Sequence, residues 1–341
     1  MKRPATSTDV ARRAGVSQST VSLVLRGKDE GRVTAETAAR VRAAARDLDY
    51  EPNAVALNLK RGRADVVALV VPTITQPYFA SVLVEAEKEA RGAGCDVILF
   101  DSGGDDDWTH RLARMVRSTQ LDGAIVWAPT DDEVAALTSI RDRLVLVEAG
   151  SDQFTRIDLQ IEHGASLVAE HLAGLGHRRV GYFAVHPARE TYLRRRRALA
   201  DSLGEHDGVI VETCSIESAL DLDAAEQAAG AMLDAIGADD SVTAVVCDDD
   251  LLAAALVTVC AERDVAVPGR VSVVGYGDLT ISRLVRPQLT TVSLPPSVGR
   301  LAMSSLLDAV RGRPRTRRTP GLVSVPVTLV ERASSAAPQQ L

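Results

Sequence analysis

The 341-residue chain has few cysteines, and no two of them lie close together in the sequence. Its four cysteines form no Cys-x-x-Cys motif. A disulfide framework or a zinc ribbon needs cysteines at close, regular spacings. We therefore expect four reduced thiols in the core, namely Cys95, Cys214, Cys247 and Cys260.

Long apolar runs and the common catalytic motifs are also missing. No run approaches the ~18–20 apolar residues of a membrane span, and the N-terminal MKRPATSTDV has no apolar signal core. There is no P-loop, GxSxG or HExxH motif, and VVPTITQPY lacks a dinucleotide fingerprint. The best argument for an enzyme is Asp248-Asp249-Asp250, because clustered carboxylates can hold Mg²⁺. We expect no enzyme, no cofactor, no metal site and no membrane partner.

Positive charge is scarce overall and concentrated at one end. Residues 1–63 contain 13 Lys and Arg against 7 Asp and Glu, a net charge of +6, whereas the whole chain is −7. Residues 64–341 therefore carry −13. A basic head on an acidic body is typical of a protein in which one domain meets a polyanion.

The segment STDVARRAGVSQSTVSLVL, residues 7–25, has the pattern of two short helices joined by a tight turn. Ser7 or Thr8 is expected to cap the first helix, Gly15 to end it, and Ser17 to cap the second. The expected buried residues are Val10, Ala11, Ala14, Val21, Val24 and Leu25. This pattern predicts a DNA-binding helix-turn-helix, with an ordinary helical hairpin as the alternative.

A third helix is expected after the loop 26–33. Thr34 caps it, and Glu36 lies in its first turn, where the helix dipole favours an anion. Its apolar stripe consists of Ala38, Val41, Ala45 and Leu48. The next segment, PNAVALNLKRG, has the composition of a very short helix that is stable only with a partner.

Residues 7–63 resemble the DNA-binding head and hinge of the LacI/GalR family of bacterial transcription regulators, and a weaker resemblance continues across nearly the whole chain. The resemblance implies that the hinge helix folds when two subunits sit side by side on DNA. It also implies that Leu59 wedges into the central minor groove and so bends the duplex, and that Asn53 contacts DNA. From the residues alone, the alternative for Leu59 is a buried linker residue.

The recognition helix supplies the remaining candidate contacts. By the resemblance, Gln18 and Ser19 occupy base-reading positions, and glutamine suits adenine edges. Leu23 offers only apolar contact, for example to a thymine methyl group. The hydroxyls of Ser17, Thr20 and Ser22 are expected to contact phosphates, with capping and solvation as the alternative. The predicted DNA-binding residues are Ser17, Gln18, Ser19, Thr20, Ser22, Leu23, Asn53 and Leu59.

The body is predicted to be α/β. Its apolar runs suit parallel strands covered on both faces: VVALVVP, CDVILFD, GAIVWAP, RLVLVEAG, RRVGYFAV, TAVVCD and VSVVGYGD. About 280 residues are too many for one sheet and favour two subdomains. The resemblance implies a two-lobed, periplasmic-binding-protein-like body behind an all-α head. The expected divisions are head 1–51, hinge 52–63 and body 64–341, with lobe 1 at about 64–162 and 294–322 and lobe 2 at about 163–293 and 323–335.

An effector pocket is expected between the lobes, at the carboxyl ends of strands. The resemblance singles out Tyr78 and Phe79, and an arginine from the run 194–197, of which Arg195 aligns best while the others form a solvated face. The candidate effector residues are Tyr78, Phe79, Asp101, Arg195, Asp249, Asp250 and Asp278. Gly277 and Leu159 replace polar residues that are usual in the family, which puts a simple sugar in doubt. An acidic wall with one arginine suits a modified sugar, a polyol or a cationic metabolite.

Together these features predict a cytoplasmic, nucleoid-associated transcription regulator, by default a repressor. We expect a homodimer on a pseudo-palindromic operator, because the C-terminal ASSAAPQQL lacks the leucine heptads of a tetramerising coiled coil. A small-molecule effector would control it. The alternatives are a corepressor-dependent or activating regulator of the same family, and a secreted binding protein, which would have no use for a helix-turn-helix.

Overall fold

A computed structural model describes residues 5–27, 29–50, 62–206, 210–238, 241–312 and 321–339. Contacts divide the chain into two compact units, residues 1–64 and residues 65–341. We call these units the head and the body.

The head is a bundle of short helices around a very small core. Within residues 5–27 and 29–50 the helices are α1 (Ser7–Ala14), α2 (Gln18–Leu25) and α3 (Ala35–Asp47). Valines 10, 21, 24 and 41 are nearly inaccessible, and five alanines fill the space between them. Gly15 ends α1 with a φ of 67°, the left-handed conformation that glycine adopts at low cost. The predicted helix-turn-helix is therefore confirmed.

The cap of α1 differs from our expectation of Ser7 or Thr8. The N-cap is Thr6, whose hydroxyl accepts a hydrogen bond from the Asp9 backbone N–H, while the Asp9 carboxylate accepts one from the Thr6 N–H at 3.0 Å. This reciprocal pair satisfies two backbone donors at once, which a cap at either later residue would not. Ser17 and Thr34 cap α2 and α3 as predicted.

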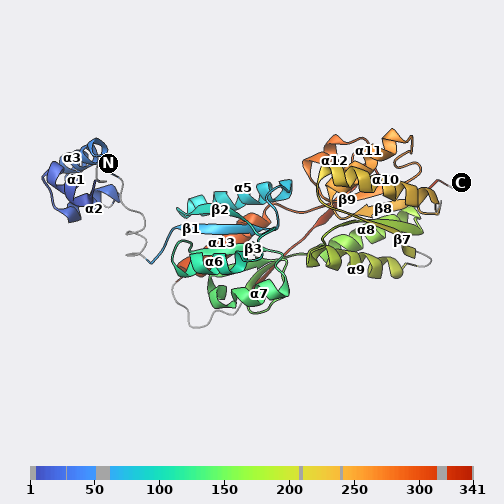
Figure 1. The fold of residues 1–341 in the computed structure, drawn as a ribbon, viewed down its shortest axis with the longest axis horizontal. Helices are drawn as coiled ribbons and strands as arrows, with labels where there is room; N and C mark the ends of the chain where they lie inside the picture. The colour runs from blue at the N-terminus through green and yellow to red at the C-terminus, as the bar shows by residue number, and fades with distance from the viewer. Residues whose placement is uncertain are drawn as a thin grey trace. The chain divides into compact units, whose positions relative to one another are not determined.

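The body contains two mainly parallel sheets, each covered by helices (Figure 1). In its described residues the first sheet has the strand order β11-β5-β4-β3-β1-β2 and the second β12-β10-β9-β8-β6-β7. The first sheet comprises β1 (Val66–Val71), β2 (Asp96–Asp101), β3 (Gly123–Trp127), β4 (Leu144–Val147), β5 (Thr155–Leu159) and β11 (Leu322–Val325). The second comprises β6 (Arg179–Val185), β7 (Ile210–Ser218), β8 (Ala244–Cys247), β9 (Ser272–Gly277), β10 (Thr290–Ser293) and β12 (Thr328–Val330). Only β12, at an edge, pairs antiparallel among these strands.

Helices pack on each sheet and complete two lobes. The first lobe contains α5 (Pro77–Gly92), α6 (Trp108–Arg117), α7 (Asp131–Leu137), the 3₁₀ helix η1 (Thr138–Arg143) and α13 (Val298–Arg311). The second contains α8 (Ile161–Leu175), α9 (Glu190–Gly204), α10 (Leu222–Ala238), α11 (Asp250–Glu262) and α12 (Thr280–Leu284). All seven apolar runs become strands, and the predicted two-lobed α/β body is confirmed. No helix in the described ranges is both long and apolar enough to cross a bilayer.

The chain passes between the lobes three times. It crosses after β5, again after β10, and finally between Val325 and Thr328. We expected one last strand after a crossing near residue 322, but that segment divides into β11 in the first lobe and β12 in the second. Pro326 separates them, because proline has no N–H to donate to a strand ladder.

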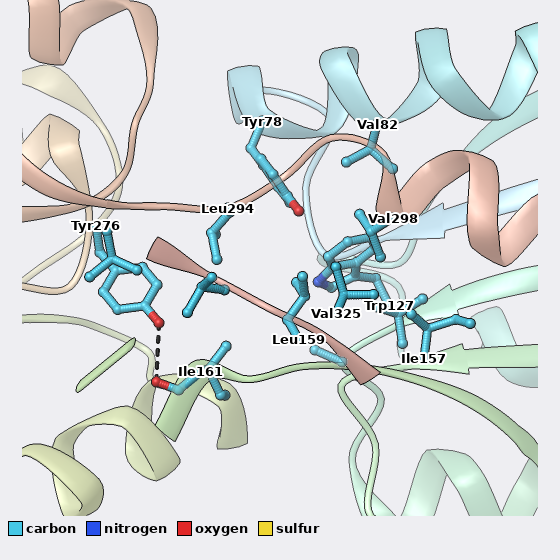
Figure 2. Close-up of a cluster of buried hydrophobic side chains, with 14 of the residues drawn as sticks. Tyr78, Val82, Trp127, Ile157, Leu159, Ile161, Tyr276, Leu294, Val298 and Val325 are labelled. Carbon is cyan, nitrogen blue, oxygen red and sulfur yellow. Dashed lines mark hydrogen bonds between the residues drawn. The ribbon is translucent and has the colours of Figure 1, made fainter. Parts of the chain in front are cut away.

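The crossings are apolar and closely packed. Leu159, Ile161, Leu294 and Val325 belong to one buried cluster that continues from one lobe into the other (Figure 2). On this cluster the Tyr276 hydroxyl donates a 3.2 Å hydrogen bond to the Ile161 carbonyl oxygen, drawn as a dashed line in Figure 2. Well-packed side chains at the crossings restrict the ways in which the lobes can move.

Candidate DNA-binding and effector sites

The N-terminal turn of α2 presents polar side chains to solvent. Ser17, Gln18 and Ser19 are exposed, whereas Val21 in the following turn is buried. The Ser17 hydroxyl accepts a hydrogen bond from the Thr20 N–H at 3.1 Å, so the predicted capping role is present in the absence of DNA. A capped helix N-terminus with exposed polar residues suits an element that enters a DNA groove.

The other predicted contacts of α2 are less accessible. Thr20, Ser22 and Leu23 are half-buried. The Gln18 amide donates a hydrogen bond to the Ser7 hydroxyl at 2.6 Å, which holds its side chain against α1. Asn53 lies outside the described residues, as does Leu59.

In the body, Tyr78 and Phe79 lie in the first turn of α5 and are both buried. Their rings pack edge-on against Trp127 at the end of β3, with ring centroids 5.5 Å and 5.3 Å apart. The Tyr78 hydroxyl has no hydrogen-bond partner among the described residues. In Figure 2 this hydroxyl points away from α5, toward the segments in which the chain crosses between the lobes.

Arg195 enters the same region from the second lobe. Its Nη1 donates a 3.0 Å hydrogen bond to the Asp248 carbonyl oxygen. Its guanidinium carbon lies 4.0 Å from the Tyr276 ring centroid and 4.8 Å from that of Tyr192. The described part of the chain offers its Nε no partner. Arg195 is thus a buried cation with an unused donor.

The expectation that the rest of the arginine run forms a solvated face is wrong for two of the three residues. Arg194 is half-buried and donates to Glu162 at 2.6 Å, and Arg196, also half-buried, donates to the Ser215 hydroxyl at 3.1 Å. Only Arg197 is exposed. The reason is helical geometry, since successive residues are about 100° apart and four in a row surround the axis.

The carboxylates of the three consecutive aspartates after β8 have different hydrogen-bond partners. Asp248 accepts from the Tyr182 hydroxyl at 2.6 Å, and Asp249 caps α11 and accepts from Gln76 of the first lobe at 2.8 Å. The Asp250 carboxylate accepts from the Thr291 hydroxyl and the Leu279 N–H. Within the described residues no group of acidic, histidine or cysteine side chains is gathered for a metal ion.

Burial raises the pKa values of these aspartates. Desolvation raises the pKa of Asp249 to about 6, an effect opposed by the hydrogen bonds from Leu251 and Gln76. Desolvation also raises the pKa of Asp250 to about 7. Buried carboxylates of this kind are common at functional sites.

Two predicted effector residues make their contacts within a single lobe. Asp101 accepts from the Gly103 N–H at 2.7 Å and shapes the loop after β2. Asp278 accepts from Arg332 at 2.5 Å and from the Ser282 hydroxyl. These contacts do not join either aspartate to Tyr78, Arg195 or Asp249.

We did not predict Glu148 from the sequence, although the structure places it beside the predicted pocket residues. It follows β4, has a φ of 54°, and is only 5% exposed. Its carboxylate accepts a hydrogen bond from the Thr191 hydroxyl of the second lobe at 2.5 Å. Burial raises its pKa, and nearby Arg195 opposes that shift. A positive φ in a non-glycine residue at a strand end is a mark of functional sites. The only sequence signal was an acidic residue directly after the apolar run RLVLV.

Comparison with known proteins agrees with a helix-turn-helix followed by a two-lobed body. Residues 6–53 match the model of the lacI family of bacterial regulatory proteins, and residues 169–335 match a periplasmic binding protein-like domain. The chain is 30% identical to the transcriptional repressor PurR of Proteus mirabilis over 340 residues, covering 97% of each protein. It is 31% identical to the transcriptional regulator GalR of Escherichia coli over 297 residues, covering 85% of this chain and 84% of GalR.

A solved structure gives the same result. The crystal structure of the Lac repressor dimer bound to operator and an anti-inducer superposes with a TM-score of 0.83 at 25% identity, covering 98% of this chain and all of that one. The named relatives are regulators of transcription and not enzymes. With a helix-turn-helix at its N-terminus and a two-lobed α/β body behind it, the chain belongs to the LacI family of bacterial transcription regulators.

Proposed function

We propose that this protein is a cytoplasmic, site-specific repressor that binds a pseudo-palindromic operator as a homodimer and responds to a small-molecule effector. The observation that carries the proposal is the exposed polar start of α2 on a packed helix-turn-helix, in a head with net charge +6. A dimer presents two such helices to successive major grooves, so operator symmetry mirrors protein symmetry.

Base reading is assigned to the accessible face of α2. Gln18 and Ser19 contact base edges, and Leu23 supplies an apolar contact. The hydroxyls of Ser17, Thr20 and Ser22 position the helix on phosphates. Gln18 must leave Ser7 to reach a base, and this costs one exposed hydrogen bond.

The region between head and body completes the DNA interface. We assign residues 1–51 to DNA binding, 52–63 to the hinge and 64–341 to effector binding and dimerisation. Asn53 and Leu59 act in the hinge, where Leu59 wedges into the minor groove and bends the operator.

The effector binds between the lobes. Tyr78, Phe79 and Glu148 contribute from the first lobe, and Arg195 and Asp249 from the second. An effector acts only through different affinities for the DNA-binding and released states. The bonds Gln76–Asp249 and Glu148–Thr191 join the lobes at this site, so a ligand that engages these groups changes lobe geometry.

The dimer surface is assigned to one side of the body. Val84 on α5, Leu99 on β2 and Leu284 on α12 are large exposed apolar residues. In Figure 1, α5 and β2 of the first lobe and α11 and α12 of the second lie along the same side of the body. Exposed apolar residues spread over one side favour association with a second copy.

Selection from a random duplex library tests the proposed recognition. Wild-type protein should enrich two related half-sites in inverted orientation, and Gln18→Ala should relax one position in each half-site, a change worth about 1–3 kcal/mol. Arg141→Ala, on the exposed surface of η1, serves as the matched control. Salt-sensitive binding by wild type without an enriched motif would contradict the proposal.

A further inference from the structure

The effector region contains more buried negative than positive charge. Glu148, Asp248 and Asp249 are 5%, 3% and 4% exposed, and the single buried arginine beside them, Arg195, is 7% exposed. Among the described residues, no lysine, arginine or histidine nitrogen lies within ion-pairing distance of any of the three carboxylates. Burying unpaired carboxylates is costly, so this region favours a cation from outside the chain.

The three carboxylates differ in how completely the chain satisfies them. Asp248 accepts from the Tyr182 hydroxyl and the Val185 N–H, at 2.6 Å and 2.8 Å. Asp249 accepts from Leu251 N–H and from Gln76. Among the described residues, Glu148 accepts one hydrogen bond, from Thr191, through Oε2. Glu148 is therefore the carboxylate with an oxygen left for a ligand.

Two unused polar groups lie in the same region. The Tyr78 hydroxyl and Arg195 Nε are both buried and unpartnered within the described ranges, and both side chains are more than nine-tenths buried. Burial of Tyr78 raises its pKa, and the Glu148 charge adds to that shift. A buried donor without a partner costs about 1–3 kcal/mol, a cost that a ligand removes by bonding to it.

The environment of Arg195 limits what it can bind. Tyr192 and Tyr276 each lie against its guanidinium, and Nη1 is committed to the Asp248 carbonyl. The Arg195 Nε has no partner among the described residues and can donate to an acceptor on a ligand, such as a hydroxyl oxygen. The neighbouring carboxylates disfavour a phosphate or a further carboxylate there, because like charges repel in a buried region.

We infer that the effector is a small hydroxylated molecule with a protonated amine, which lies beside Glu148 and Tyr78 while one of its hydroxyl oxygens accepts from Arg195. This inference rests on the proposed function of the cleft. It selects the cationic class from the modified sugars, polyols and cations that the sequence left open. The amine donates to the free oxygen of Glu148 and compensates its charge.

Thermal unfolding of the full-length protein with matched hexoses tests the inference. The probes are glucosamine, galactosamine and mannosamine, their neutral parent hexoses, and the corresponding 6-phosphates. We expect at least one amine to raise the unfolding midpoint by ~5 °C at saturation, and its parent hexose and 6-phosphate to have little effect. Equal or larger shifts with the neutral or phosphorylated compounds, or no shift with any amine, would overturn the inference.

A variant pair links the result to Glu148. Glu148→Gln keeps the size and an oxygen for Thr191 but removes the charge, so it should weaken binding of the amine at least tenfold and leave any neutral hexose unaffected. Asp142→Asn, on the exposed surface of η1, should bind the amine as wild type does. If Glu148→Gln binds the amine normally, the assignment is wrong.

The two proposals fail separately. If only the ligand class is wrong, the protein still enriches a pseudo-palindrome from the library but does not respond to amines. If the proposed function is wrong, no motif is enriched, whether or not an amine stabilises the body.

Discussion

Gln76 Nε2 at the start of α5 donates a 2.8 Å hydrogen bond to Asp249 Oδ2 at the start of α11, and so joins the two lobes of the body. The two residues are 173 positions apart in the chain. Each lies at the N-cap of a helix beside the proposed effector site. The bond therefore connects lobe closure directly to the region where a ligand would bind.

Gln76→Glu should open the body at pH 8. The substitution places a second carboxylate beside buried Asp249, and repulsion replaces the bond. At pH 5 the pair can share a proton and stay closed, because the pKa of Asp249 is already raised to about 6. Small-angle X-ray scattering should give a larger radius of gyration for the variant than for wild type at pH 8, and equal radii at pH 5.

Thr75→Glu adds the same charge one residue earlier, at an exposed position, and should scatter as wild type does at both pH values. If Gln76→Glu and Thr75→Glu are indistinguishable at pH 8, this bond does not hold the lobes together.

Asp250→Asn should change how stability depends on pH. The pKa of Asp250 is raised to about 7 by burial, with Asp249 and Asp278 adding to the shift. Because its pKa is raised, the protonated Asp250 contributes stability that is fully present below about pH 4 and is lost as pH rises toward 7. Asparagine can accept from the Leu279 N–H through Oδ1 and donate through Nδ2 to the Thr291 hydroxyl oxygen, without a charge. The unfolding free energy of the variant, relative to wild type, should therefore rise over this interval by up to about 4 kcal/mol.

Urea unfolding at a series of pH values measures this difference. Asp234→Asn is the control, since Asp234 is exposed and forms an ion pair with Arg263. A constant difference between Asp250→Asn and wild type from pH 4 to 8 would contradict the account of Asp250.

Gly164→Ala should destabilise the body. A Cβ atom at this position would lie 2.6 Å from the Tyr276 hydroxyl and 2.9 Å from Val327. Both are held in the packed cluster at the crossings, and overfilling such a site costs about 1–3 kcal/mol. The urea midpoint should fall.

Gly174 lies in the same helix, and a Cβ atom at this position would have no other atom within 4 Å. Gly174→Ala should therefore stabilise the body, by about 0.5–1 kcal/mol, through helix propensity alone. If the two substitutions have the same effect, the close packing at Gly164 is not significant.

Leu284→Arg should convert the proposed dimer to monomer. Leu284 is 69% exposed and lies on the side of the body assigned to dimerisation. A buried, unpaired arginine at a subunit interface is strongly unfavourable. Light scattering after size-exclusion chromatography should show one chain in place of two.

Leu322→Arg is the matched control, since Leu322 is also exposed but lies on β11, at the opposite edge of the first sheet from β2. It should remain dimeric. If both variants are dimers, the interface lies elsewhere on the body.

The sequence predicted best what depends on local pattern. Apolar runs located the strands that are covered on both faces, and periodicity with capping residues located the head helices. It did not indicate β5, whose sequence TRIDL mixes charged and apolar residues. It also missed the Thr6–Asp9 capping box, although the spacing of these residues matches that motif.

The site was harder to predict because it is assembled from distant segments. Arg195 was proposed through resemblance and stays a prediction, whereas the contact between Glu148 and Thr191 joins residues 43 apart on different lobes. Nothing in the run RLVLVEAG shows that its glutamate turns inward. Asp101 and Asp278 follow strands as pocket residues do, yet their carboxylates stabilise local loops. Position at a strand end therefore selects candidates, and tertiary contacts decide among them.

The most direct test of the central claim is selection of fragments of the source genome with the purified protein, followed by sequencing. We predict that the recovered fragments share one pseudo-palindrome and lie upstream of a small number of genes. Fragments scattered without a common motif, bound weakly and lost at moderate salt, would show that the head does not recognise a specific site and would contradict the account.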